Sequence, residues 1–180
     1  MQGNILGIRI APLTASPGIR AALSALLIET VASGGSVSFM HPLAQRDADA
    51  FWQDPLAAAD RGERIVLGAF DQEHLIATVT LLLSLPPNQP HRAEIAKMMT
   101  RLSHRGRGVA RALLREAETI AVARGRTLLV LDTATEEGAS WLYERVGFTL
   151  SGIIPDYALK PHGGLVGTMI YWKRIGEAAA

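Results

Sequence analysis

Cysteine is absent from the 180 residues of the sequence. A disulfide framework, a thiolate zinc site and a cysteine nucleophile are therefore excluded. An excess of charge of one sign is lacking too, because 18 basic residues balance 17 acidic residues to a net charge of +1. Nothing in this balance indicates a nucleic acid as partner.

Long hydrophobic runs are also missing. The longest apolar stretch, residues 75–85, is interrupted by two threonines and a serine, and it is shorter than the ~20 residues that cross a bilayer. Residues 1–10 have no basic start followed by an apolar core, so they do not resemble a secretory signal. We therefore expect a cytoplasmic protein that has no membrane partner.

The composition that is present is typical of a globular protein, with 48% hydrophobic and 19% charged residues. The length predicts one domain over residues 1–180, and the three terminal alanines, residues 178–180, predict a disordered tail. The histidines show no paired spacing, so we expect no metal site.

The first half of the chain predicts a strand over residues 5–12 and then two helices. Ser16 and Pro17 open the first helix as N-cap and first-turn proline, and Ser33-Gly34-Gly35 ends it. The second helix covers residues 44–59, and Pro55 must bend or split it. A hairpin (64–70 and 75–83), a loop (86–90) and a further strand (92–100) follow.

The second half predicts a long amphipathic helix over residues 106–124, closed by Gly125. The apolar run 127–131 predicts a strand covered on both faces. Another helix (135–146), with Glu136 and Glu137 in its first turn, and two late strands (148–154 and 166–171) complete the chain. This order predicts an α/β sandwich with a mixed, mostly antiparallel sheet flanked by helices.

The loop before the long helix carries the clearest chemical signal. Gly106 and Gly108 let the backbone approach a ligand closely, and the unpaired N–H groups of a helix start favour phosphate. Arg105, Arg107 and Arg111 add charge-assisted hydrogen bonds. The P-loop pattern is absent, and the dinucleotide pattern is incomplete because Arg111 replaces its third glycine. A solvated helix start is the alternative interpretation.

Two motifs in this order resemble one family. Arg105, Gly108 and Ala110 match [Q/R]-x-x-G-x-[G/A], and residues 143–148 match Y-x-x-x-G-F at the end of a later helix. With these motifs the chain resembles the GNAT superfamily of N-acetyltransferases, which implies a three-layer fold and acetyl-CoA as co-substrate. Segments that run from residue 29 almost to the C-terminus, including 91–99 and 168–171, look like the tabtoxin-resistance acetyltransferases. That likeness implies acetylation of a primary amine of a small molecule, by direct attack in a ternary complex, as in detoxification of a toxin or antibiotic.

The resemblance also implies roles for single residues. The backbone of Met98, Met99 and Thr100 pairs with the pantetheine arm, and Arg105, Gly106, Arg107, Gly108, Val109, Ala110 and Arg111 hold the pyrophosphate. Tyr143 lies near the thioester sulfur as the acid, and Glu94 and Asp132 relay a proton from the amine. Many members have asparagine seven residues before the tyrosine, where this chain has Glu136.

Each catalytic residue keeps an alternative interpretation. Strand alternation places Glu94, Ala96 and Met98 on one face, but Glu94 also suits an ion pair with Arg92 or Lys97. Asp132 suits a turn, and Tyr143 suits the core. From their positions we expect the acceptor near Glu29, Phe39, Trp52 and Tyr157.

The acceptor itself stays open. A protein or peptide amine and a non-catalytic acyl-CoA sensor remain rival functions, and the chain is expected to be a monomer or a homodimer.

Overall fold

The computed structural model describes residues 3–5, 7–136 and 140–176 of the chain. Its centre is an eight-stranded sheet in the order β1-β2-β3-β4-β5-β6-β8-β7. Among the described strands β5 and β6 run parallel, and the other neighbours run antiparallel, which confirms the predicted mixed sheet. The strands are β1 Gly3–Ile5, β2 Ile8–Pro12, β3 Arg64–Asp71, β4 His74–Leu82, β5 Arg92–Thr100, β6 Leu128–Ala134, β7 Thr149–Leu159 and β8 Leu165–Arg174.

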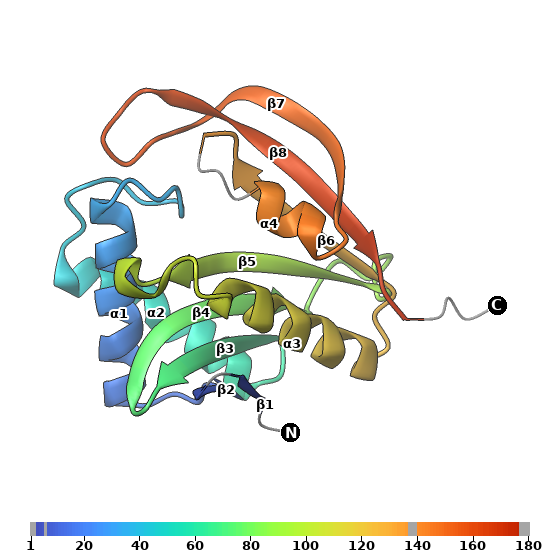
Figure 1. Cartoon of the computed structure of the whole chain (residues 1–180), viewed down its shortest axis with the longest axis horizontal. Coiled ribbons are helices and arrows are strands. Elements are labelled where there is room, and N and C mark those ends of the chain that lie inside the picture. The colour runs from blue at the N-terminus through green and yellow to red at the C-terminus, as the bar shows by residue number, and fades with distance from the viewer. Residues whose placement is uncertain (1–2, 6, 137–139, 177–180) are drawn as a thin grey trace.

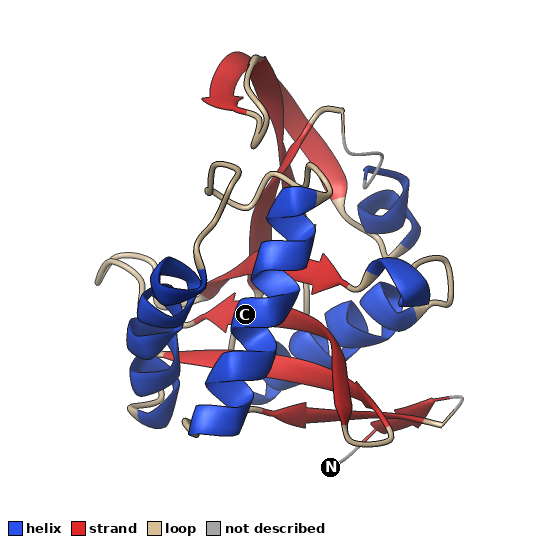
Figure 2. Ribbon diagram, turned by 90° about the vertical axis from the view of Figure 1, so that its left-hand side faces the viewer, coloured by secondary structure: helices blue, strands red, loops and turns tan. Residues whose placement is uncertain are grey.

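Helices cover both faces of the sheet and make a three-layer sandwich (Figure 2). Alternate residues of β3 show the two sides, because Val66 packs with helices α1 Pro17–Ala32 and α2 Gln45–Asp60, whereas Leu67 packs with α3 Val109–Ala123. The short helix α4 Ser140–Arg145 places Tyr143 in the same apolar cluster as α3. The predicted fold class is therefore confirmed.

The first helix follows its sequence signals closely. The Ser16 hydroxyl accepts a hydrogen bond from the Ile19 N–H at 3.2 Å, and Pro17 is the first helical residue. Of the two outcomes expected at Pro55, a bend or a split, the split does not occur, because α2 continues from Gln45 to Asp60. A proline inside a helix removes one backbone hydrogen bond, and here the buried residues Trp52 and Leu56 hold the helix on the sheet across that position.

A bulge in β5 inverts the direction of its side chains. Thr78 pairs with Met99 and Thr80 pairs with Ala96, so one residue of β4 opposes two of β5. Lys97 lies within this bulge at φ +51°, in the left-handed region. Met98 consequently packs against the α3 cluster, and the expectation that Glu94, Ala96 and Met98 share one face is wrong.

Three other expectations need correction. The predicted first strand is a small hairpin, β1 and β2, with Gly7 at φ +81° between them. In β6 Leu129 is buried but Val130 is only half-buried, because α1 and α2 lie over β3 to β5 and leave that face of β6 less covered. The predicted helix 135–146 is α4 alone among the described residues, with Thr135 and Glu136 in a turn. Glu137 and the predicted tail, residues 178–180, lie outside the described residues.

The parallel pair β5 and β6 separates along its length (Figure 1). Its register pairs are Arg92 with Leu128, Ala93 with Leu129, and Glu94 with Val130. Beyond these pairs β5 continues to Thr100 without a strand partner on that side in the described part of the chain. The fork between the two strands is where the pockets described below lie.

Candidate active site

One pocket of about 820 Å³ lies over the end of β5 and the start of α3, and we call it the loop pocket. It is lined by every residue for which the sequence predicted a cofactor contact. These are Met98, Met99, Thr100, Arg105, Gly106, Arg107, Gly108, Val109, Ala110 and Arg111. The end of α1 and residues of α4 form its remaining walls.

Two glycines give the loop its shape. Gly106 has φ +75°, and Gly108, the N-cap of α3, has φ +80°. A Cβ at either position meets no atom within 4 Å, so the glycines are required by their backbone torsion rather than by crowding. This turn brings the first helical residues, Val109 to Arg111, to the pocket wall, where a helix start presents unpaired N–H groups.

Arginines concentrate positive charge at this wall. Arg105, Arg107 and Arg111 form no ion pair with any residue in the described ranges. Arg111 lies in the first turn of α3, where the helix dipole disfavours a cation. Glu136 lines the same pocket, but its carboxylate is paired with Lys160 at 2.9 Å. Guanidinium groups that have no carboxylate partner among the described residues and lie beside a helix start fit a polyphosphate ligand.

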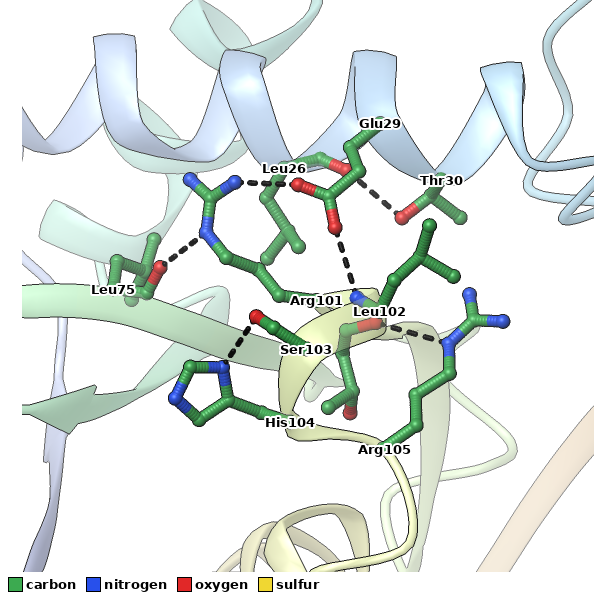
Figure 3. A network of polar contacts seen from close by, with 10 residues as sticks. Leu26, Glu29, Thr30, Leu75, Arg101, Leu102, Ser103, His104 and Arg105 are labelled. Atoms are coloured by element: carbon green, nitrogen blue, oxygen red, sulfur yellow. Dashed lines mark hydrogen bonds and ion pairs between the residues drawn. The ribbon is translucent and has the colours of Figure 1, made fainter.

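Glu29 fixes the approach to this loop (Figure 3). Its Oε2 lies 2.6 Å from Nη1 of Arg101, and its Oε1 accepts a hydrogen bond from the Leu102 N–H at 2.9 Å. Arg101 also donates from Nε to the Leu75 carbonyl at 3.0 Å. The contacts of Glu29 and Arg101 together hold the 3₁₀ turn Leu102–His104, which precedes Gly106 and Gly108. Glu29 lines neither the loop pocket nor the smaller pocket described next, and its contacts position the loop.

A second, smaller pocket of about 230 Å³ lies in the fork between the strands, and we call it the fork pocket. Its walls come from β5, β6, α4, the β7–β8 hairpin and residues 36–38. Asp132, Tyr143 and Tyr157 line it, as three of the sequence predictions require. The Asp132 carboxylate accepts a hydrogen bond from the Thr168 hydroxyl at 3.3 Å.

The buried ring of Tyr143 is held by aromatic neighbours. Its centroid lies 6.1 Å from that of Phe148 and 5.9 Å from that of Tyr171. Burial, together with the hydrogen bond to Glu144, raises the pKa of Tyr171, so this neighbour stays neutral. The ring of Tyr143 therefore has a fixed place in the fork pocket wall.

The two pockets adjoin. Val37, Met98 and Leu142 line both of them, and Tyr143 directly follows Leu142 on α4. A ligand that fills the loop pocket therefore reaches the fork pocket beside these side chains.

Besides Glu29, three predicted site residues line neither pocket. Glu94 lines neither pocket, and its Oε2 lies 3.1 Å from Nη1 of Arg92, which is the ion pair weighed as its alternative. Trp52 is fully buried in the core, and Phe39 packs edge-on against Phe51 with centroids 5.0 Å apart. The surroundings of these residues depend on an ion pair and on tertiary packing, which the local sequence pattern does not specify.

Lys97 is an ionisable residue of the fork pocket to which the sequence assigned no role in the site. Its ammonium donates a hydrogen bond to the hydroxyl of Ser38, which lines the same pocket, at 3.1 Å. Burial lowers the pKa of Lys97, and the negative charge of Asp132 opposes that shift. Regular strand alternation does not place Lys97 here, since the bulge turns it toward the pocket.

Neither a cluster of metal-binding side chains nor a membrane-spanning helix occurs within the described ranges. No group of three histidine or acidic residues there is arranged to hold a metal ion. No helix in that part of the chain is both long and apolar enough to cross a membrane.

Comparison with known proteins adds a family and a set of similar folds. The model of the acetyltransferase (GNAT) family matches residues 33–148, which include the fork, the glycine loop and α4. Among curated proteins, rat N-acetyltransferase 8F1 is 35% identical over 68 residues. That match covers 37% of this chain and 31% of the relative, so the chain spans under a third of that protein's length.

Similar solved structures share the fold at low sequence identity. Ribosomal-protein-alanine N-acetyltransferase from Brucella melitensis has a TM-score of 0.76 at 20% identity, over 92% of this chain and 99% of that one. The structure of yncA from Salmonella typhimurium with its cofactor acetyl-CoA has a TM-score of 0.74 at 18% identity, over 95% and 96%. A candidate phosphinothricin N-acetyltransferase has a TM-score of 0.74 at 22% identity, over 93% and 99%.

Proposed function

The chain belongs to the acetyltransferase (GNAT) family, and from this premise we propose that it transfers an acetyl group from acetyl-CoA to a primary amine of a small molecule. The proposal places the whole reaction in one domain, residues 1–180. The observation that carries it is the meeting of the loop pocket and the fork pocket at Val37, Met98 and Leu142. One pocket suits a polyphosphate carrier and the other a compact acceptor.

Acetyl-CoA supplies an activated acetyl thioester when bound. In the proposal Arg105, Arg107 and the start of α3 bind the pyrophosphate, because they offer guanidinium groups without a carboxylate partner in the described ranges, and the N–H donors of a helix start, at one wall. The backbone of Met98 to Thr100 on the open side of β5 pairs with the pantetheine amides as an added strand does. Glu136 takes no part in binding in this scheme, since Lys160 holds its carboxylate.

Proton transfer is assigned to two residues of the fork pocket. Asp132 accepts the proton of the acceptor ammonium, directly or through water, because its carboxylate faces the pocket. Tyr143 donates a proton to the departing thiolate beside Leu142. Glu94 is a weaker candidate for the relay because Arg92 already binds its carboxylate. With no cysteine in the chain, the direct transfer of a ternary complex is the natural scheme.

The small volume of the fork pocket supports a small acceptor over a peptide. The neighbour named as a candidate phosphinothricin N-acetyltransferase agrees with the tabtoxin-resistance likeness and with a detoxifying role. The Brucella structure keeps a second candidate, acetylation of a protein N-terminus, in consideration. A non-catalytic sensor is the third, and the polar side chains of Asp132 and Tyr143 at the fork argue against it.

The proposal is tested in two steps. Acetyl-CoA is first added in a thermal shift experiment, in which binding raises the melting temperature with ligand concentration. Thiol release is then followed with a panel of small amines, β-lactam amino acids and short peptides. No thermal shift contradicts the cofactor assignment, and turnover of peptides alone contradicts the small acceptor.

A further inference from the structure

The chain holds three lysines, and two of them have carboxylate partners. Lys160 lies 2.9 Å from Glu136, and Lys173 lies 2.6 Å from Glu118. Lys97 has no carboxylate within 4.0 Å in the described part of the chain. Its ammonium contacts the Ser38 hydroxyl at 3.1 Å and lies 5.8 Å from the centre of the Phe51 ring.

The position of this unpaired charge is strained as well as half-buried. Lys97 has φ +51°, a conformation that costs an L-residue about 1–2 kcal/mol, and burial lowers its pKa by penalising the charged form. A half-buried cation without an anion is unfavourable for the free protein. Such local costs collect at functional sites, where a ligand offsets them.

Opposite charges face the same small space. Lys97 on β5 and Asp132 on β6 both line the fork pocket, and Asp132 is near enough to influence the charge of Lys97. The Thr168 hydroxyl donates a hydrogen bond to the Asp132 carboxylate, and the Ser38 hydroxyl accepts one from the Lys97 ammonium. Each of the two charged groups therefore has an uncharged hydrogen-bond partner. The wall of this pocket of about 230 Å³ thus carries one positive and one negative side chain.

We propose that the Lys97 ammonium and the Ser38 hydroxyl form an anion-binding subsite of the fork pocket, which selects acceptors that carry a carboxylate or phosphate near the reacting amine. The inference rests on the proposed acetyl transfer and adds a specificity-determining residue to it. Lys97 and Ser38 bind the acidic group, while Asp132 faces the amine. An acceptor that is cationic throughout places a positive charge next to Lys97 and is disfavoured.

The experiment compares matched acceptors that differ in charge alone. Thiol release from acetyl-CoA is measured with a set of amino acids and with the carboxamide of each, for the wild type and for Lys97→Met, Lys97→Arg and Lys160→Met. The ratio of kcat/KM for acid over amide is the readout, since intrinsic differences between the two amines cancel when variants are compared. Lys160 is the matched control, because it is a nearby lysine that lines none of the pockets.

We expect Lys97→Met to reduce the acid-to-amide ratio by about tenfold or more through KM, with acetyl-CoA binding unchanged in thermal shift. Lys97→Arg should keep much of the ratio, and Lys160→Met should keep it within about twofold. An unchanged ratio in Lys97→Met overturns the inference, as does turnover of amides without turnover of acids. If Lys97→Met does not fold, Lys97→Gln and Ser38→Ala provide the same comparison.

The result also separates this inference from the function on which it rests. Turnover of neutral amines with no role for Lys97 leaves acetyl transfer standing and removes the subsite. No thiol release with any amine, acidic ones included, overturns both.

Discussion

Glu29 of α1 and Arg101 after β5 form a half-buried ion pair at 2.6 Å, although 72 residues separate them in the sequence. The same carboxylate binds the Leu102 N–H, so α1 holds the turn that leads into the glycine loop (Figure 3). A helix of the N-terminal half thereby positions the glycine loop, at which we propose that the cofactor binds.

We expect Glu29→Gln to weaken acetyl-CoA binding by about three- to tenfold, because loss of the charged contact leaves the loop less ordered before binding. Calorimetric titration measures the Kd. Glu63→Gln is the control, since Glu63 forms a comparable ion pair with Arg61 at an exposed position. Equal affinities in the two variants would show that the ion pair does not position the loop.

Gly108→Ala should cost about 1–2 kcal/mol of stability, because alanine is strained at φ +80°. It should also reduce acetyl-CoA affinity about tenfold by shifting the start of α3. Gly125→Ala, at φ +70° at the other end of the same helix, is the control for strain alone. Denaturant unfolding and titration are compared, and weakened binding in both variants would contradict a specific role for Gly108.

Tyr143→Phe should lower kcat for thiol release by about 100-fold and leave the Kd for acetyl-CoA within about twofold, because only the proton donor is lost. Tyr171→Phe is the matched control, because the Tyr171 ring lies 5.9 Å from that of Tyr143 but lines neither the fork pocket nor the loop pocket. An unchanged kcat in Tyr143→Phe would remove the acid role.

Asp132→Asn should lower kcat about 100-fold, whereas Glu94→Gln should change kcat little and reduce the melting temperature, since its partner is Arg92. The pH dependence of kcat extends the comparison, because loss of the general base removes the decline of kcat at acidic pH. A large loss of kcat in Glu94→Gln with little change in Asp132→Asn would assign the general base to Glu94.

Lys97→Met should raise the melting temperature at neutral pH, because burial holds the pKa of Lys97 below its ordinary value. The folded state then binds fewer protons than the unfolded state between the lowered pKa and the unfolded pKa of about 10.4, so wild-type stability rises with pH in that window. The advantage of the variant should therefore shrink toward alkaline pH. Asp132, the charge that faces Lys97 across the pocket, opposes the effect, so Asp132→Asn should enlarge it. A constant difference across pH would contradict this account.

The sequence predicted best where a local signal decides the structure. Ser16 and Pro17 placed the start of α1, and the glycine–arginine pattern located seven residues, Arg105 to Arg111, that line one pocket. The sequence predicted poorly where contacts between residues far apart in the chain determine the structure. Alternation could not reveal the bulge at Lys97, because the extra residue is defined by its pairing with β4. The surroundings of Glu29 and Trp52 could not be predicted, because they come from segments far along the chain.

The fork between β5 and β6 has a mechanical consequence for the whole molecule. In the described chain three register pairs join β5 to β6. At this seam few backbone hydrogen bonds therefore connect strands β1 to β5 with strands β6 to β8. We expect amide hydrogen exchange to show β1 to β5 and β6 to β8 opening as separate cooperative units. A pantetheine arm bound in the fork would add hydrogen bonds across the seam. Such a ligand would make the two units melt as one.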